Sequence, residues 1–218
     1  LRMSRGLGDV YKRQGLTIQD GVIYDEAGQS VCTVAKVGME SSYSRSHSLH
    51  ITAEETYHCE QNSFATGVCF AEIEVDIPLG QIHVLRLVNV HDSGKIINPK
   101  LAEAQCHGGM SMGLGYALSE ELLFDADCRP LNANLLDYKI PTAMDTPDLE
   151  VHFVEVEDPT APYGNKALGE PPTIPVAAAV RNALLHATGI SVNSLPLTPQ
   201  KLIEHFRDAG LLGGTHHV

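Results

Sequence analysis

The clearest pattern along the chain is an alternation of apolar and polar residues that begins at residue 68. It runs from Val68 to Ile77, stops at Pro78-Leu79-Gly80, and resumes from Gln81 to Val90. The apolar positions are Ala71, Ile73, Val75 and Ile77 in the first run and Ile82, Val84, Val88 and Val90 in the second. A period of two residues is typical of a strand with one buried and one solvated face. The pattern therefore predicts an antiparallel hairpin.

Three helices are predicted after the hairpin. The first runs from Pro99 to about Leu118, because Asn98 is a good N-cap and proline suits the first helical position. The second covers Thr173 to Ala187 and ends at Gly189, and the third is capped from Thr198 and ends near Ala209.

Weaker patterns surround these elements. We expect a strand pair over Leu16 to Ile23 that turns at Asp20-Gly21, a strand or a helix over Val31 to Val37, a loop over Ser41 to Ser48, and strands over Glu120 to Phe124 and Glu150 to Glu157. Strand pairs interspersed with helices indicate an α+β fold. Since no linker or internal repeat is visible, residues 15–210 are interpreted as one domain or one lobe of a larger one.

The first predicted helix contains four glycines, Gly108, Gly109, Gly113 and Gly115. Each glycine costs a helix about 1 kcal/mol relative to alanine. Two explanations are open at this stage. Either another helix packs closely against this one, or a flat ligand lies against bare backbone.

Composition and charge narrow the classes of function. The chain has 218 residues, 43% of them hydrophobic, and a net charge of -12. Such a charge argues against nonspecific nucleic-acid binding, which neutralises phosphates with lysine and arginine. The sequence shows neither a long apolar run nor a signal-peptide pattern. We therefore expect a soluble, cytoplasmic protein that acts on small molecules or binds protein partners.

The five cysteines lack a Cys-x-x-Cys pair, so neither a disulfide framework nor an iron–sulfur or zinc site is predicted. The two ends of the chain look different from the rest. Residues 1–14 are basic and without apolar period, and we interpret them as a segment derived from a cloning adapter. Residues 211–218 are rich in glycine and predict a flexible tail.

Two polar stretches are candidates for chemistry. Glu170 stands between Gly169 and Pro171-Pro172, where a polar loop meets the second helix. The turn would hold one carboxylate rigidly at a helix end that favours its ionised form, or it would simply start the helix. His91 and Asp92 are either an acid–base pair or, as is commoner, an aspartate that caps its own loop.

Taken together, six segments between residues 50 and 210 resemble the C-terminal part of the molybdenum-binding subunit of bacterial xanthine dehydrogenases, which are molybdenum hydroxylases. The segments are Phe70 to Asp76, His91 to Pro99, Gln105 to Gly115, Tyr138 to Pro141, Lys166 to Pro172, and Leu197 to Pro199. Their common order makes the resemblance specific, whereas a single segment would not be.

The resemblance implies roles for three residues. Glu170 matches the general base of the family, which takes a proton so that an oxygen derived from water can attack an electrophilic carbon. Gln105 matches a glutamine that hydrogen-bonds the pterin cofactor, and Gly169 matches a position beside the metal. No protein ligand to the metal is implied. Met112 stands where the family often has glutamine, so that position receives no role.

The resemblance also implies a cofactor, partners and a substrate. The cofactor would be molybdenum-molybdopterin, in bacteria as the cytosine dinucleotide, with iron–sulfur clusters and FAD on partner subunits. The missing N-terminal part of the same subunit would carry most cofactor contacts, so this chain is expected to be a fragment that is inactive alone. We expect purine hydroxylation, from hypoxanthine and xanthine to urate. The alternatives are aldehydes or other N-heterocycles, or a noncatalytic molybdopterin-binding scaffold.

Overall fold

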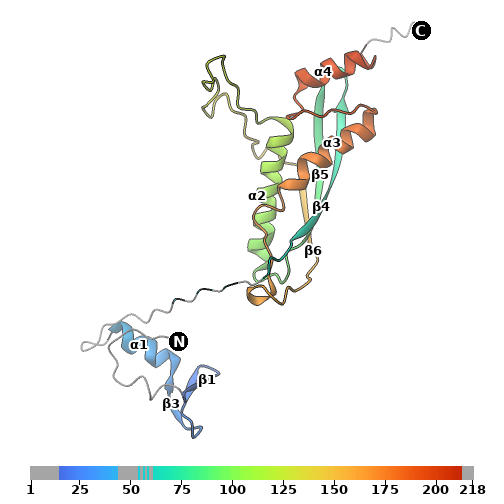
Figure 1. The fold of residues 1–218 in the computed structure, drawn as a ribbon. Helices are drawn as coiled ribbons and strands as arrows, with labels where there is room; N and C mark the ends of the chain where they lie inside the picture. The colour runs from blue at the N-terminus through green and yellow to red at the C-terminus, as the bar shows by residue number, and fades with distance from the viewer. Residues whose placement is uncertain (1–14, 44–53, 55, 57, 59–60, 213–218) are drawn as a thin grey trace. The chain divides into compact units, whose positions relative to one another are not determined.

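The computed structural model describes residues 15–43, 54, 56, 58 and 61–212. The predicted adapter segment 1–14, most of the predicted loop Ser41 to Ser48, and residues 213–218 of the predicted tail lie outside the described residues. The chain divides into two compact units, Leu1–His58 and Cys59–Val218 (Figure 1). Each unit is described by itself.

The first unit is a small antiparallel sheet followed by a helix. Its strands are β1 (Thr17–Gln19), β2 (Val22–Tyr24) and β3 (Ser30–Thr33), in the order β1-β2-β3. The predicted turn at Asp20-Gly21 is confirmed, because both residues have positive φ, at 49° and 76°, as a tight hairpin turn requires. Residues 31–37 contain both predicted elements, because α1 (Val34–Tyr43) starts directly after β3. The helix includes Ser41, so the loop predicted from that residue was wrong at its start.

The second unit is built on a three-stranded sheet with the order β4-β5-β6. The predicted hairpin is confirmed as β4 (Thr66–Asp76) and β5 (Gln81–Asp92), which pair antiparallel. The third strand, β6 (Asp148–Phe153), lies parallel to β5. A parallel pair needs a long crossover, and the chain between β5 and β6 provides one. The α+β fold class is therefore confirmed, with one parallel pairing added to the expected antiparallel pairs.

A β-bulge in the hairpin changes which side chains of β5 face the core. Glu72 pairs with Arg86, but Ile73 pairs with Val84, so Leu85 is an extra residue on β5. Because a strand alternates with a period of two, one extra residue reverses its faces. Ile82 and Val84 pack against the core as predicted. Beyond the bulge, the fully or almost fully buried positions are Leu87, Asn89 and His91, and the predicted core positions Val88 and Val90 take the other face.

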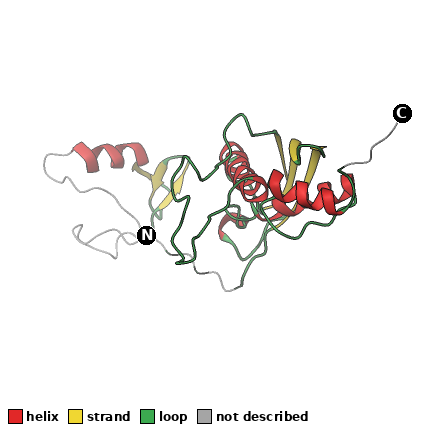
Figure 2. Cartoon of the chain, turned by 90° about the horizontal axis from the view of Figure 1, so that it is seen from above, coloured by secondary structure: helices red, strands yellow, loops and turns green. Residues whose placement is uncertain are grey.

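Three helices pack with this sheet: α2 (Pro99–Leu118), α3 (Ile174–Thr188) and α4 (Pro199–Asp208). α2 and α3 contact each other and cover one face of the sheet (Figure 2). The predicted caps are present, since Asn98 accepts a hydrogen bond from the Leu101 amide and Thr198 from the Lys201 amide. Among the described residues, no helix combines the length and apolar character that crossing a membrane requires.

Close packing explains Gly109 and Gly113 in α2. A Cβ added to Gly109 would lie 2.8 Å from Pro172 Cβ, and one added to Gly113 would lie 2.6 Å from Val176 Cβ. Both distances are too short for real atoms, so α3 and the residues before it can approach α2 only over glycine. Gly108 differs, because no described atom lies within 4 Å of its added Cβ.

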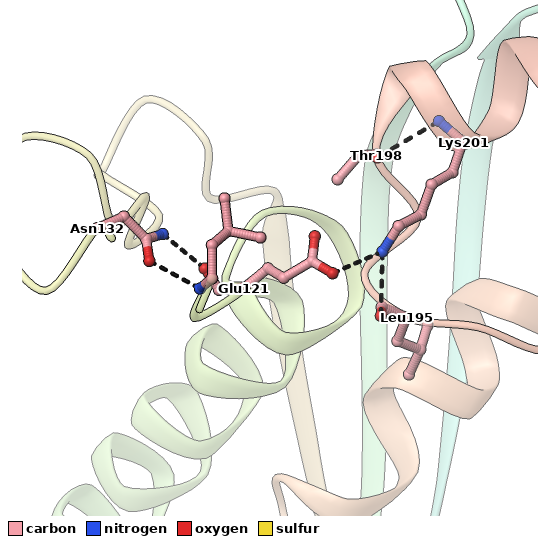
Figure 3. Close-up of polar contacts among 6 residues, drawn as sticks. Glu121, Asn132, Leu195, Thr198 and Lys201 are labelled. Atoms are coloured by element: carbon pink, nitrogen blue, oxygen red, sulfur yellow. Dashed lines mark hydrogen bonds and ion pairs between the residues drawn. The ribbon is translucent and has the colours of Figure 1, made fainter. Parts of the chain in front are cut away.

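The segment between α2 and β6, residues 119–147, projects from the helices as an arm (Figure 1). The strand predicted over Glu120 to Phe124 is absent; Phe124 forms only an isolated bridge. Instead, side chains hold the start of the arm (Figure 3). Asn132 Nδ2 donates to the Glu121 carbonyl at 2.7 Å, and Lys201 Nζ of α4 donates to Glu121 Oε1 at 2.9 Å. These contacts replace strand pairing as the source of order in the arm.

The glycine contacts predict opposite effects for two alanine substitutions in α2. Gly113→Ala should lower the free energy of unfolding by about 1–3 kcal/mol, because the new methyl group overlaps Val176. Gly108→Ala, the matched control, should raise it by up to about 1 kcal/mol, because alanine favours the helix and meets open space. Urea unfolding followed by circular dichroism measures both. Equal midpoints for the two variants would contradict the packing described here.

Candidate functional site

Glu170 lies in a segment that runs beside the end of β5. On one side of Glu170, the Lys166 amide donates to the Ser93 carbonyl at 2.7 Å. On the other side, Asn89 Nδ2 donates to the Pro172 carbonyl at 3.0 Å. The Glu170 carboxylate itself is exposed. The backbone is therefore tied to Ser93, directly after β5, on one side of Glu170 and to Asn89 of β5 on the other, while Glu170 itself is exposed.

The predicted position of Glu170 at a helix end was wrong in detail. α3 begins at Ile174, with Pro175 in its first turn, whereas Pro171 and Pro172 belong to a turn before the helix. The Thr173 amide donates to the Glu170 carbonyl at 3.0 Å, which closes that turn. The electrostatic effect of a helix end fades within one turn. The fixed backbone on both sides of Glu170, rather than the end of α3, therefore explains how this residue is held in place.

An ion pair reinforces the contact between the two loops. Lys166 Nζ lies 2.7 Å from Asp92 Oδ2, and the two side chains are only 10% and 16% exposed. Burial alone would raise the pKa of Asp92, but hydrogen bonds from Lys166 and from the Gly94 and Val156 amides outweigh it and hold this pKa below its usual value. Asp92 also accepts from Gly94 at 3.0 Å, so it caps its own loop.

His91 is not placed to act together with Asp92. Neighbouring residues on a strand point to opposite faces, and His91 is 1% exposed. Its ring lies over Gly67, where an added Cβ would come within 2.2 Å of His91 Nδ1. Burial lowers the pKa of His91, and a backbone contact with Thr66 opposes that shift in part. The structure thus favours the loop-capping interpretation of this motif.

Gln105 lies next to the Glu170 segment. A Cβ added to Gly169 would lie 3.9 Å from Gln105 Nε2 and meets no other described atom within 4 Å outside its own chain neighbours. The structure therefore brings Gln105 and Gly169 together, with Glu170 adjacent in the chain. Gln105 and Gly108 belong to an exposed face of α2, on which Leu101 is 68% exposed and Met112 is 62% exposed.

A row of buried polar side chains was not predicted from the sequence. Asn89, His91 and Ser93 occupy alternate positions along the end of β5 and are at most 2% exposed. Asn89 Oδ1 and Ser93 Oγ have no hydrogen-bond partner among the described residues. In the sequence, these polar residues alternate with Val88 and Val90. The alternation indicates which side chains are buried only when the bulge at Leu85 is known.

A small cavity adjoins Ser93. It has a volume of about 240 Å³ and is lined by Ser93, Ile96, Leu101 and Leu168, among others. A larger cavity of about 590 Å³ lies elsewhere, between the start of β5, the end of α2 and the arm, and its lining includes none of the three predicted site residues. The lining of the smaller cavity includes none of them either, and it reaches the segment before Glu170 only through Asn165, Lys166 and Leu168.

The groups around Glu170 suit a cofactor held by hydrogen bonds. Gln105 offers an exposed amide, and Gly108 and Gly169 leave bare backbone that a flat ligand can approach. Among the described residues, no group of three or more histidine, cysteine, aspartate or glutamate side chains could hold a metal ion.

A family model matches more than half of the chain. The model of the molybdopterin cofactor-binding domain matches residues 9–147. The chain belongs to this family. Gln105 lies inside the matched residues, Gly169 and Glu170 lie beyond them, and the match begins within the stretch predicted to derive from an adapter.

Sequence relatives of this chain include molybdenum-binding subunits of a xanthine dehydrogenase and of an aldehyde oxidoreductase. A putative xanthine dehydrogenase molybdenum-binding subunit of Escherichia coli (strain K12) is 46% identical over 192 residues, which cover 88% of this chain and 26% of the relative. An aldehyde oxidoreductase molybdenum-binding subunit of the same organism is 35% identical over 78% of this chain and 25% of the relative. The chain thus spans about a quarter of the length of these relatives.

Solved structures show the same fold. Quinoline 2-oxidoreductase from Pseudomonas putida 86 matches with a TM-score of 0.73 and 27% identity over 89% of this chain and 26% of that chain. The aldehyde oxidoreductase from Desulfovibrio gigas matches with a TM-score of 0.60 and 32% identity over 66% of this chain and 15% of that chain. These likenesses confirm the predicted molybdopterin-binding fold.

The cysteine beside Gln105 provides a test of how α2 is buried. Burial raises the pKa of the Cys106 thiol and of the Cys69 thiol to about 11, whereas Cys128 is exposed. At pH 8 only about one Cys106 thiol in a thousand is then the reactive thiolate. Iodoacetamide labelling mapped by mass spectrometry should modify Cys128 in the folded chain, and Cys106 only in denaturant. Equal labelling rates of these two thiols in the folded chain would contradict this account.

Proposed function

We propose that this chain supplies the general base, Glu170, and a cofactor contact, Gln105, to a molybdenum hydroxylase that oxidises purines. One observation carries the proposal. Gln105, on an exposed face of α2, lies beside Gly169, while the backbone on the two sides of Glu170 is tied to Asn89 of β5 and to Ser93 directly after it. A base needs fixed geometry with its carboxylate accessible, and this arrangement provides both.

The residues divide the work by chemical type. When bound, the molybdenum cofactor supplies the two-electron oxidation. The Glu170 carboxylate accepts the proton from the water-derived oxygen that becomes the new hydroxyl group of the substrate. The Gln105 amide can both donate and accept a hydrogen bond, which suits the polar edge of a pterin. Gly169 keeps the space beside Gln105 open.

The proposed substrate is hypoxanthine or xanthine, with urate as the final product. Hydroxylation adds one oxygen from water and releases two electrons and two protons. The support is the 46% identity to a xanthine dehydrogenase subunit, above the 35% identity to an aldehyde oxidoreductase subunit. Aldehydes and other N-heterocycles are the second candidate class, favoured by that aldehyde oxidoreductase and by the likeness to quinoline 2-oxidoreductase.

The proposal includes the partners and the form of the cofactor. The electrons would leave through iron–sulfur clusters and FAD on partner subunits, the cofactor would be the cytosine dinucleotide, and the location would be the cytoplasm. The chain spans about a quarter of the E. coli relative, and we propose that the remainder of such a subunit completes the site. A noncatalytic scaffold would have no need of Glu170, so substitution of this residue separates the two functions.

The experiments use a reconstituted subunit, in which residues 15–218 of this chain replace the matching segment of the E. coli relative. Gln105→Ala should weaken cofactor binding by about ten-fold, the effect of one lost hydrogen bond of about 1.4 kcal/mol. Molybdenum per subunit, measured by mass spectrometry of the purified protein, should fall accordingly. Gln200→Ala, at an exposed position of α4, is the matched control and should keep full occupancy. Full occupancy in Gln105→Ala would contradict the contact.

Glu170→Gln in the reconstituted subunit should lower xanthine kcat by about 10²–10⁴-fold, the range for loss of a general base. Molybdenum occupancy should stay unchanged, because the amide keeps the size of the side chain. Glu204→Gln, at an exposed position of α4, is the control and should leave kcat unchanged. The rate of urate formation from xanthine measures kcat for both variants.

Two results of that experiment would count against separate parts of the proposal. Wild-type turnover in Glu170→Gln would remove Glu170 as the base. Good activity of the unsubstituted protein on aldehydes, with none on purines, would overturn the substrate while leaving the role of Glu170 intact.

A further inference from the structure

The segment that carries Glu170 has no regular secondary structure of its own between the 3-10 helix at Pro162–Gly164 and α3. Its position depends on the loop that follows β5. The Lys95 amide donates to the Gly164 carbonyl at 2.9 Å, and Gly94 forms an isolated bridge with Asn165. A Cβ on Gly94 would lie 2.3 Å from the Gly164 carbonyl oxygen, so this close approach requires glycine.

Among these contacts, the ion pair between Asp92 and Lys166 differs from the surface pairs. Its Nζ–Oδ2 distance is 2.7 Å and its side chains are 10% and 16% exposed. The neighbouring Lys95–Glu157 pair has a distance of 3.5 Å and side chains that are 55% and 66% exposed. Exposed pairs contribute little, whereas removal of one partner of a buried pair leaves an uncompensated charge. The Asp92–Lys166 pair can therefore hold the loop in place, whereas the exposed Lys95–Glu157 pair cannot.

Asp92 connects three parts of the chain. Its Oδ2 accepts from Lys166, and its Oδ1 accepts from the Gly94 amide at 3.0 Å and from the Val156 amide at 3.4 Å. The Asp92 carboxylate, at the end of β5, thus joins the loop after β5 through Gly94, the residues after β6 through Val156, and the segment that leads to Glu170 through Lys166. Lys166 precedes Glu170 by four positions in the sequence.

We propose that Asp92 and Lys166 are positioning residues for Glu170. Their ion pair holds the backbone before Glu170 against the end of β5, while Asn89 holds the Pro172 carbonyl after it. Neither charge touches the substrate. The inference rests on the proposed role of Glu170 as base. Because a displacement of about 1 Å can cost about 100-fold in rate, loss of the pair acts on turnover more than on substrate binding.

The test is a double-mutant cycle in the reconstituted subunit. Asp92→Asn and Lys166→Gln should each lower xanthine kcat about 100-fold while KM changes less than about two-fold. The double substitution should be no worse than either single one, because it leaves no unpaired buried charge. Lys95→Gln, which breaks the exposed pair of the same loop, is the matched control and should keep wild-type kcat.

A second cycle separates positioning of Glu170 from a general loss of structure. If Asp92 acts through Glu170, Asp92→Asn should cause no further loss of kcat when added to Glu170→Gln. A full further 100-fold loss would overturn the inference, and so would wild-type kcat in Asp92→Asn while Glu170→Gln is impaired. Wild-type kcat in Glu170→Gln would instead refute the proposed function.

Hydrogen exchange of the 218-residue chain gives a readout that needs no cofactor. Asp92→Asn should speed exchange in peptides that cover residues 163–173. Exchange in residues 73–84 of the hairpin should be unchanged, because these residues lie away from the ion pair. Unchanged exchange in 163–173, or equal acceleration in both peptides, would overturn the positioning role.

Discussion

The constraint on which the site depends is the end of β5. The bulge at Leu85 turns Asn89 toward the core, where its amide reaches the Pro172 carbonyl at 3.0 Å. Asp92, at the last position of the strand, reaches Lys166. Both contacts act on one short segment, which has Glu170 between them. A central strand paired on both edges is a rigid support, and it fixes a loop that has no ladder of its own.

Helix packing provides the second wall of the site. Gly109 and Gly113 allow Pro172, Thr173 and Val176 to approach α2 more closely than any side chain would permit. The same approach brings Gly169 to Gln105. Close packing is therefore confirmed for Gly109 and Gly113, whereas Gly108 makes no such contact and leaves open backbone on the other face of the helix.

The sequence was sufficient for elements whose signals are local. The hairpin, the Asn98 and Thr198 caps and the Asp20-Gly21 turn follow from alternation, capping and turn chemistry, and the structure has them. The bulge at Leu85 leaves no local signal, because it depends on register with β4. The Asp92–Lys166 pair joins residues 74 positions apart, and parallel pairing of β6 is equally nonlocal. Glu170 was a local candidate, but its role as base and the choice of Gln105 came from a family resemblance, and only the fold shows that Gln105 and Gly169 are neighbours.

Locating the metal tests the central claim most directly. The claim is that Gln105, Gly169 and Glu170 form one wall of a molybdenum site supported by the end of β5. A crystal of the cofactor-loaded reconstituted subunit, with an anomalous difference map at the molybdenum absorption edge, gives the metal position without assumption. The account predicts a peak beside Gly169, on the side of the Glu170 carboxylate, with the pterin within hydrogen-bond distance of Gln105. A peak remote from this segment, with Glu170 in bulk solvent, would contradict it.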